Sequence, residues 1–211
     1  PNFVKEITYL VIQPHEVELH KDKQVLVLPT DVKGIHNTRK WIYEHAKDSV
    51  WGMYDDDLSF IKRNGSKKTV MNEDDWKDML DRTYHWLTTD ASFAGHRLSF
   101  LPPSGQDYRE NSAIHCACYF NGKVIPKFLD WSIPLAEDLH MFLQLLKSGF
   151  NNKVWEKYSV DNKAYADGGC NTFRNIEMIN ECHTQLIGEH PEFVQNMGLT
   201  KTKMGDMIKI K

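Results

Sequence analysis

The sequence has few cysteines, almost no net charge, and no apolar run that approaches the roughly 20 residues of a membrane span. Four irregularly spaced cysteines are too few for a disulfide framework, and with eight methionines they are typical of a reducing cytosol. The net charge of -3 gives no overall positive field, so any DNA contact has to come from local basic patches. No repeat or low-complexity segment appears, and 211 residues suit a single domain.

Short apolar runs rich in β-branched and aromatic residues predict buried strands at 9–12, 25–28 and 50–54. Between the second and the third, "GIHNTRKWIYEHA" repeats apolar residues at helical spacing, with Asn37 or Thr38 as its cap. A strand, a helix and a strand in succession predict a βαβ unit. We therefore expect an α/β fold over residues 1–211, with a mixed, mostly parallel central sheet flanked by helices.

The remaining chain is predicted to alternate hairpins, helices and one long loop. Asn64-Gly65 and Asn121-Gly122 lie between apolar runs, and each predicts a β-hairpin. The polar stretch 101–112, which contains proline and glycine, predicts a loop long enough to be functional. Helices are predicted from Glu73 to Thr88 with Asn72 as cap, over "PLAEDLHMFLQLLKSG" with Gly149 at its end, from Thr172 to Ile187, and after Pro191.

"VWGMYDDDLSF" places three aspartates directly after a predicted buried strand. In extended chain Asp55 and Asp57 point the same way and could converge on a hard cation such as Mg²⁺ or Mn²⁺. Such ions take one or two carboxylates and complete their shell with water and phosphate oxygens. The carboxyl end of a strand is also where α/β sheets bind ligands. A basic neighbour or plain water would satisfy the same acids, so the pattern alone leaves the metal open.

Two classes of enzyme use paired aspartates in this way. "DDDLS" fits the D-x-D-x-[ST] pattern of phosphohydrolases, which would form a phosphoaspartate at Asp55. It also fits the D-x-D of glycosyltransferases, which holds a metal on the pyrophosphate of a nucleotide sugar. The phosphohydrolase motif usually lies on the first strand, whereas two predicted strands and a helix precede it here. Position therefore favours the glycosyltransferase, and a non-catalytic binding module is the third alternative.

Four segments, "GIHNTRKWIYEHA", "MYDDDLSF", "WSIPLAEDLHMFLQLLKSGF" and "DGGCNTFRN", resemble in order and spacing the phage-type GT-A glycosyltransferases associated with DNA hydroxylases, the TET-associated glycosyltransferases. The resemblance covers roughly residues 9–175. It implies a GT-A-like fold, Mn²⁺ or Mg²⁺ as cofactor, and sugar transfer from a nucleotide sugar (UDP-glucose or similar) to hydroxymethyl-pyrimidines in double-stranded phage DNA, in the host cytoplasm. A transferase acting on protein or carbohydrate would share every motif. The family opens with a nucleotide-binding segment, so we expect a further segment before Pro1.

The resemblance also assigns roles at matching positions. It implies that Asp55 and Asp57 hold the metal, and that Asp138, with Glu137 as the alternative, takes the proton of the acceptor hydroxyl. Taken alone, two acids in the first turn of a helix are also explained by the helix dipole. The implied donor contacts are Arg39, Asp56, Asn37 and Thr38.

Contacts with the acceptor and its DNA are expected at local basic, aromatic and glycine positions. A basic turn close to the aspartates suits phosphate contacts, although a solvated turn explains it equally well. The long polar loop offers a tyrosine and an arginine that could contact a base turned out of the duplex. A glycine pair would let the backbone approach a ligand closely. These residues are Lys62, Arg63, Tyr108, Arg109, Gly168 and Gly169.

Overall fold

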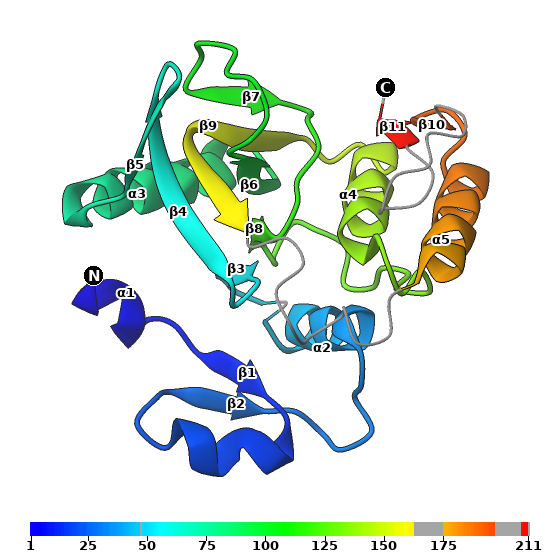
Figure 1. The fold of residues 1–211 in the computed structure, drawn as a ribbon, viewed down its shortest axis with the longest axis horizontal. Helices are drawn as coiled ribbons and strands as arrows, with labels where there is room; N and C mark the ends of the chain where they lie inside the picture. Colours follow the sequence, from blue (N-terminus) through cyan, green and yellow to red (C-terminus); the bar gives the residue numbers. More distant parts are fainter. Residues whose placement is uncertain (47, 163–174, 197–207, 211) are drawn as a thin grey trace.

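A computed structural model describes residues 1–46, 48–162, 175–196 and 208–210. Its centre is a seven-stranded sheet in the order β3-β8-β6-β9-β4-β5, with β7 paired to β9 (Figure 1). The strands are β3 (Val50–Tyr54), β4 (Leu58–Asn64), β5 (Lys67–Val70), β6 (Phe93–Leu98), β7 (Tyr108–Glu110), β8 (Ala117–Asn121) and β9 (Asn152–Asn162). Within this sheet the pair β6–β9 is parallel and the other pairs are antiparallel. The class is α/β as predicted, but the expectation of a mostly parallel sheet is wrong.

Helices cover both faces of the sheet. Helix α3 (Glu73–Thr89) packs on one face, where its buried residues meet Trp155 and Tyr158 of β9. Helices α2 (Ile35–Ala46), α4 (Glu137–Lys147) and α5 (Ile176–Glu189) contribute to the core on the other face (Figure 1). Consecutive residues Phe93 and Ala94 of β6 belong to the two different core clusters, as expected for alternation along a strand.

The N-terminal residues form a small unit beside the main sheet (Figure 1). It contains α1 (Asn2–Glu6), β1 (Leu10–Ile12), the 3₁₀ helix η1 (Pro14–His20) and β2 (Val25–Val27). Strands β1 and β2 pair in parallel as a separate two-stranded sheet. The predicted strands exist, but β2 and β3 lie in different sheets, so the predicted βαβ unit is wrong. Sequence pattern identifies a strand without identifying its neighbour.

Several local signals correctly mark where elements begin and end. The turn at Asn64-Gly65 joins β4 to β5 as a hairpin. The Asn72 side chain accepts a hydrogen bond from the backbone of Asp75 (2.9 Å) and caps α3 as predicted. Gly149, just beyond α4, has φ +84, the left-handed conformation that a helix-ending glycine adopts.

Four predicted boundaries or elements are wrong or displaced. Helix α2 begins at Ile35, before either predicted cap, and no hairpin follows Asn121, where the chain turns into a loop. The long loop after β6 contains the short strand β7. Strand β10 (Val194–Asn196), paired with β11 (Ile208–Ile210), follows Pro191 in place of a helix. Helix α5 begins at Ile176, while its predicted start at Thr172 lies outside the described residues.

Among the helices described, none has the length and apolar character needed to cross a bilayer.

Candidate active site

The three aspartates form the connection between β3 and β4. Asp55 directly follows β3, whereas Asp56 and Asp57 occupy an exposed turn, so the predicted extended geometry for Asp55 and Asp57 is wrong. Strands β3 and β6 both run antiparallel to β8, and β6 runs parallel to β9. The carboxyl ends of β3, β6 and β9 therefore point to one edge of the sheet, and the aspartates lie at that edge. This is the position at which α/β sheets bind ligands.

Arg39 gathers carboxylates from two distant segments of the chain. It is one helical turn before the core residue Tyr43 on the inward face of α2, and only 6% of it is exposed. Its Nη2 lies 2.6 Å from Asp55 Oδ1, and its Nη1 lies 3.3 Å from Glu137 Oε1 and 4.0 Å from Asp138 Oδ2. One buried guanidinium thus joins the end of β3 to the start of α4.

The acids of α4 are presented by an unusual backbone turn. Ala136, which precedes the helix, has φ +83, a left-handed conformation that costs about 1–2 kcal/mol for a residue other than glycine. Asp138 Oδ1 accepts a hydrogen bond from the backbone of Leu139 (2.8 Å), which leaves Oδ2 toward Arg39. Of the two acids, Asp138 is the more accessible, with 18% of its side chain exposed against 8% for Glu137. The helix dipole and Arg39 therefore act on the same pair of acids.

His115 and Cys116 complete the cluster, and no sequence pattern singles out His115 as a catalytic residue. His115 Nδ1 lies 3.8 Å from Asp138 Oδ2. Cys116 has φ +57, and its carbonyl accepts a hydrogen bond from the backbone of Asp55 (3.0 Å). Residues with strained backbones cluster at functional sites. Three non-glycine residues of the described chain have positive φ, and two of them, Cys116 and Ala136, lie next to residues of this cluster.

Burial controls the protonation of these groups. It raises the pKa of Glu137 to about 7 against the opposing effect of Arg39, and the neighbouring Asp138 raises it further. Burial alone would lower the pKa of Arg39, but Glu137, Asp55 and Asp138 together raise it well above its usual value. Burial lowers the pKa of His115, although Asp138 opposes the shift, and burial raises the pKa of the Cys116 thiol. The cluster therefore holds one permanent cation, Arg39, among three carboxylates. Of these, Glu137 is partly protonated near neutral pH.

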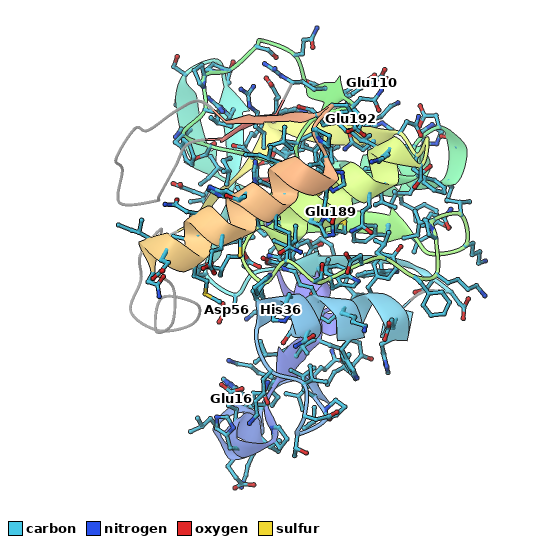
Figure 2. All side chains as sticks on the ribbon, turned by 90° about the vertical axis from the view of Figure 1, so that its right-hand side faces the viewer. Glu16, His36, Asp56, Glu110, Glu189 and Glu192 are labelled. Carbon is cyan, nitrogen blue, oxygen red and sulfur yellow. The ribbon has the colours of Figure 1, made fainter. Side chains whose placement is uncertain are left out.

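The donor residues expected from the resemblance lie at the same edge. Figure 2 shows Asp56 and His36 near the N-terminal end of α2. Asn37 donates to the carbonyl of Lys33 (2.9 Å), and the backbone of Thr38 donates to the carbonyl of Gly34 (3.0 Å). The structure thus brings Asn37 and Thr38 onto the helix turn that carries Arg39, while their contact with a donor stays a prediction.

The expected DNA contacts are not gathered at the cluster. Tyr108 packs against Trp86 of α3, with ring centroids 4.9 Å apart, in the core on the other face of the sheet. Arg109 binds Glu156, and Lys62 Nζ lies 2.6 Å from Asp75 Oδ1 of α3. Arg63 is buried beneath the loop after β6. Gly168 and Gly169 lie outside the described residues.

Comparison with known proteins adds a family to this geometry. A sequence model of the TET-Associated Glycosyltransferase family matches residues 4–169. The chain is 29% identical over 204 residues to the Beta-glucosyl-HMC-alpha-glucosyl-transferase of Enterobacteria phage T2, an alignment that covers 87% of this chain and 72% of the relative. The protein of the same name from Enterobacteria phage T6 is 28% identical over 207 residues, with the same coverage. No solved structure matches the chain.

Proposed function

Because the chain belongs to the TET-Associated Glycosyltransferase family, we propose that it transfers a sugar from a nucleotide sugar to hydroxymethylcytosine in phage DNA. The two phage relatives are named for transfer to an HMC residue that already carries a glucose. The acceptor hydroxyl is therefore either that of the hydroxymethyl group or one on a sugar attached to it. The observation that carries the proposal is the cluster of Asp55, Glu137 and Asp138 around Arg39 at the carboxyl edge of the sheet.

We assign the donor, UDP-glucose or a similar nucleotide sugar, to the end of the cluster at Asp55. Among the described residues, no three His, Cys, Asp or Glu side chains form a ready metal-binding group. The chemistry of the proposed ligands nevertheless suits Mn²⁺ or Mg²⁺, because Asp55 and Asp57 are carboxylates two residues apart at the carboxyl end of β3. Asp55 and Asp57 would hold the ion, with water and diphosphate oxygens completing its shell. The ion supplies charge stabilisation for the departing diphosphate.

Asp138 is the proposed base. The acceptor oxygen forms a bond to the anomeric carbon of the sugar, the bond from that carbon to the diphosphate oxygen breaks, and the acceptor proton passes to Asp138. Asp138 is preferred over Glu137 because its side chain is more exposed, at 18% against 8%, and an acceptor can therefore reach it more easily. His115 faces the same Asp138 oxygen as Arg39 and would help to orient it.

Mass spectrometry of the modified base tests this function. The protein is incubated with nucleotide sugars and with duplexes that contain unmodified cytosine, hydroxymethylcytosine, or glucosylated hydroxymethylcytosine. We expect one added hexose on one or both modified duplexes and none on plain DNA. Asp138→Asn should abolish the addition, whereas Asp81→Asn, which removes the same charge from an exposed position on α3, should not. Transfer to protein or carbohydrate acceptors alone, or release of phosphate from esters without any nucleotide sugar, would refute the proposal.

A further inference from the structure

The β4–β5 hairpin sets two positive charges directly opposite each other. Arg63 of β4 pairs with Lys68 of β5 in the antiparallel register, so both side chains lie on one face of the hairpin. Like charges at such positions destabilise a hairpin. The adjacent Lys62 points to the other face and is neutralised by Asp75, so the two faces differ in net charge.

Neither member of this pair has an acidic partner in the described part of the chain. Arg63 is 8% exposed, its Nη1 donates to the carbonyl of Leu101 (2.9 Å), and its Nε is buried without a hydrogen-bond partner. Lys68 Nζ donates to Ser99 Oγ (3.1 Å). Both partners are neutral, and no ion pair of either residue occurs among the described residues. A buried guanidinium is costly without a counter-charge, so an anion from outside the protein would stabilise this arrangement.

A second group of cations lies under the same loop. The loop after β6 contacts Lys68 through Ser99, and further along it Ser104 donates from its backbone to Glu156 (2.9 Å). Glu156 also binds both Arg97 and Arg109, and 38% of the Arg109 side chain is exposed. One carboxylate thus serves two guanidinium groups. We call Arg63, Lys68, Arg97 and Arg109 the loop cation surface. Lys68 and Arg109 are its exposed members, and Arg63 and Arg97 are mostly buried. With Glu156 these residues carry four positive charges and one negative, a net +3.

We propose that the loop cation surface binds the phosphate backbone of the DNA duplex that carries the acceptor base. Arginine, lysine and serine side chains are common phosphate contacts, and they orient a protein on a duplex without reading its sequence. Such a local group of cations would allow a chain of net charge -3 to bind DNA. This inference rests on the proposed function because that function supplies the DNA acceptor. The positions of the four cations do not depend on it.

The position of this surface suits a duplex that also reaches the cluster around Arg39. Strand β4 begins beside the aspartate turn and ends at the hairpin, as Figure 1 shows. Its seven residues span roughly 20 Å at about 3.3 Å per residue. That length corresponds to roughly six base pairs at about 3.4 Å each. A base turned out of the helix toward Asp138 would therefore leave neighbouring phosphates within reach of Lys68.

Salt-dependent DNA binding tests the surface in the full chain. Fluorescence anisotropy with an unmodified duplex of about 20 base pairs gives the slope of log K against log salt, which changes by about 1 for each phosphate that the protein no longer neutralises. Lys68→Gln should make this negative slope shallower by about 1 and should weaken DNA binding several-fold at low salt. The matched control is Lys123→Gln, which removes the same charge from an exposed residue just after β8. This control should leave the slope unchanged. Equal slopes for the two variants would overturn the proposal.

Two further measurements separate this inference from others. In calorimetry with the nucleotide sugar, the donor affinity of Lys68→Gln should equal that of Lys123→Gln, and a selective loss would mean that the surface binds the donor phosphates instead. Where the wild type transfers sugar to a modified duplex, Lys68→Gln should raise KM for that duplex several-fold. If no acceptor is modified, the proposed function fails while the binding comparison still decides the role of the surface.

Discussion

Replacing Arg39 by methionine should destabilise the protein more than most single substitutions. The change keeps an unbranched side chain of similar length but leaves Asp55, Glu137 and Asp138 near one another without their common cation. Removing one partner of a buried ion pair costs about 3–5 kcal/mol. Asp55 and Asp138 are partly exposed and can regain water, so we expect a value near the lower end, about 3 kcal/mol. At about 2–4 °C per kcal/mol for a domain of this size, Tm should fall by about 10 °C.

Chemical denaturation of Arg39→Met, alone and combined with Glu137→Gln, measures this effect. Because Glu137 is the most buried of the three acids, its neutralisation should recover at least about 1 kcal/mol of the loss, as coupled neighbours do. Adding Mn²⁺ should stabilise Arg39→Met more than the wild type, since its carboxylates then lack a cation. An Arg39→Met variant within about 1 kcal/mol of the wild type, with no recovery in the double variant, would refute the view that Arg39 holds the cluster together.

Three other substitutions test separate parts of the account. His115→Ala should lower kcat about ten- to hundredfold with little change in donor affinity, because Asp138 loses a neighbour that orients it; equal loss of donor affinity in steady-state kinetics would contradict this. A Cβ on Gly95 would press on Ile114 and lie 2.9 Å from the carbonyl of Ala117, so Gly95→Ala should cost about 1–3 kcal/mol in denaturation experiments. Burial would raise the pKa of Glu156, but hydrogen bonds from Ser104 and two arginines lower it to about 2. Since the folded pKa is depressed, this contribution to stability is present above about pH 4.5 and lost toward pH 2, a fall of about 3 kcal/mol that Glu156→Gln should lack.

Local sequence signals identify most elements of the fold but not their partners. The capping asparagine of α3, the Asn64-Gly65 turn and the end of α4 at Gly149 act within a few residues, and each is predicted correctly. Strand pairing depends on contacts between distant segments, which periodicity does not contain. The apolar run ending at Asn121 therefore looks like half of a hairpin, although its strand pairs with β3 and β6.

The candidate site shows the same division. The acids at 55–57 and 137–138 stand out in the sequence, but the meeting of Asp55, Glu137 and Asp138 at Arg39 depends on the fold, as the ion pairs show. His115 is not recognised because "HCAC" resembles alternating residues of a strand, whereas φ +57 at Cys116 interrupts the alternation just before β8 begins. The basic residues at 62 and 63 look equivalent in sequence, yet they lie on opposite faces of β4. Only Arg63 contributes to the loop cation surface.

The most direct test of the proposed site is calorimetric binding of UDP and UDP-glucose with and without Mn²⁺. The wild type and Asp81→Asn should bind the nucleotide in a metal-dependent manner, and Asp57→Asn should lose that dependence because a carboxylate assigned to the ion is gone. Binding by all three proteins with equal affinity and the same metal dependence would contradict the placement of the donor at the aspartate turn. The absence of nucleotide binding by the wild type under any metal would contradict the donor site as a whole.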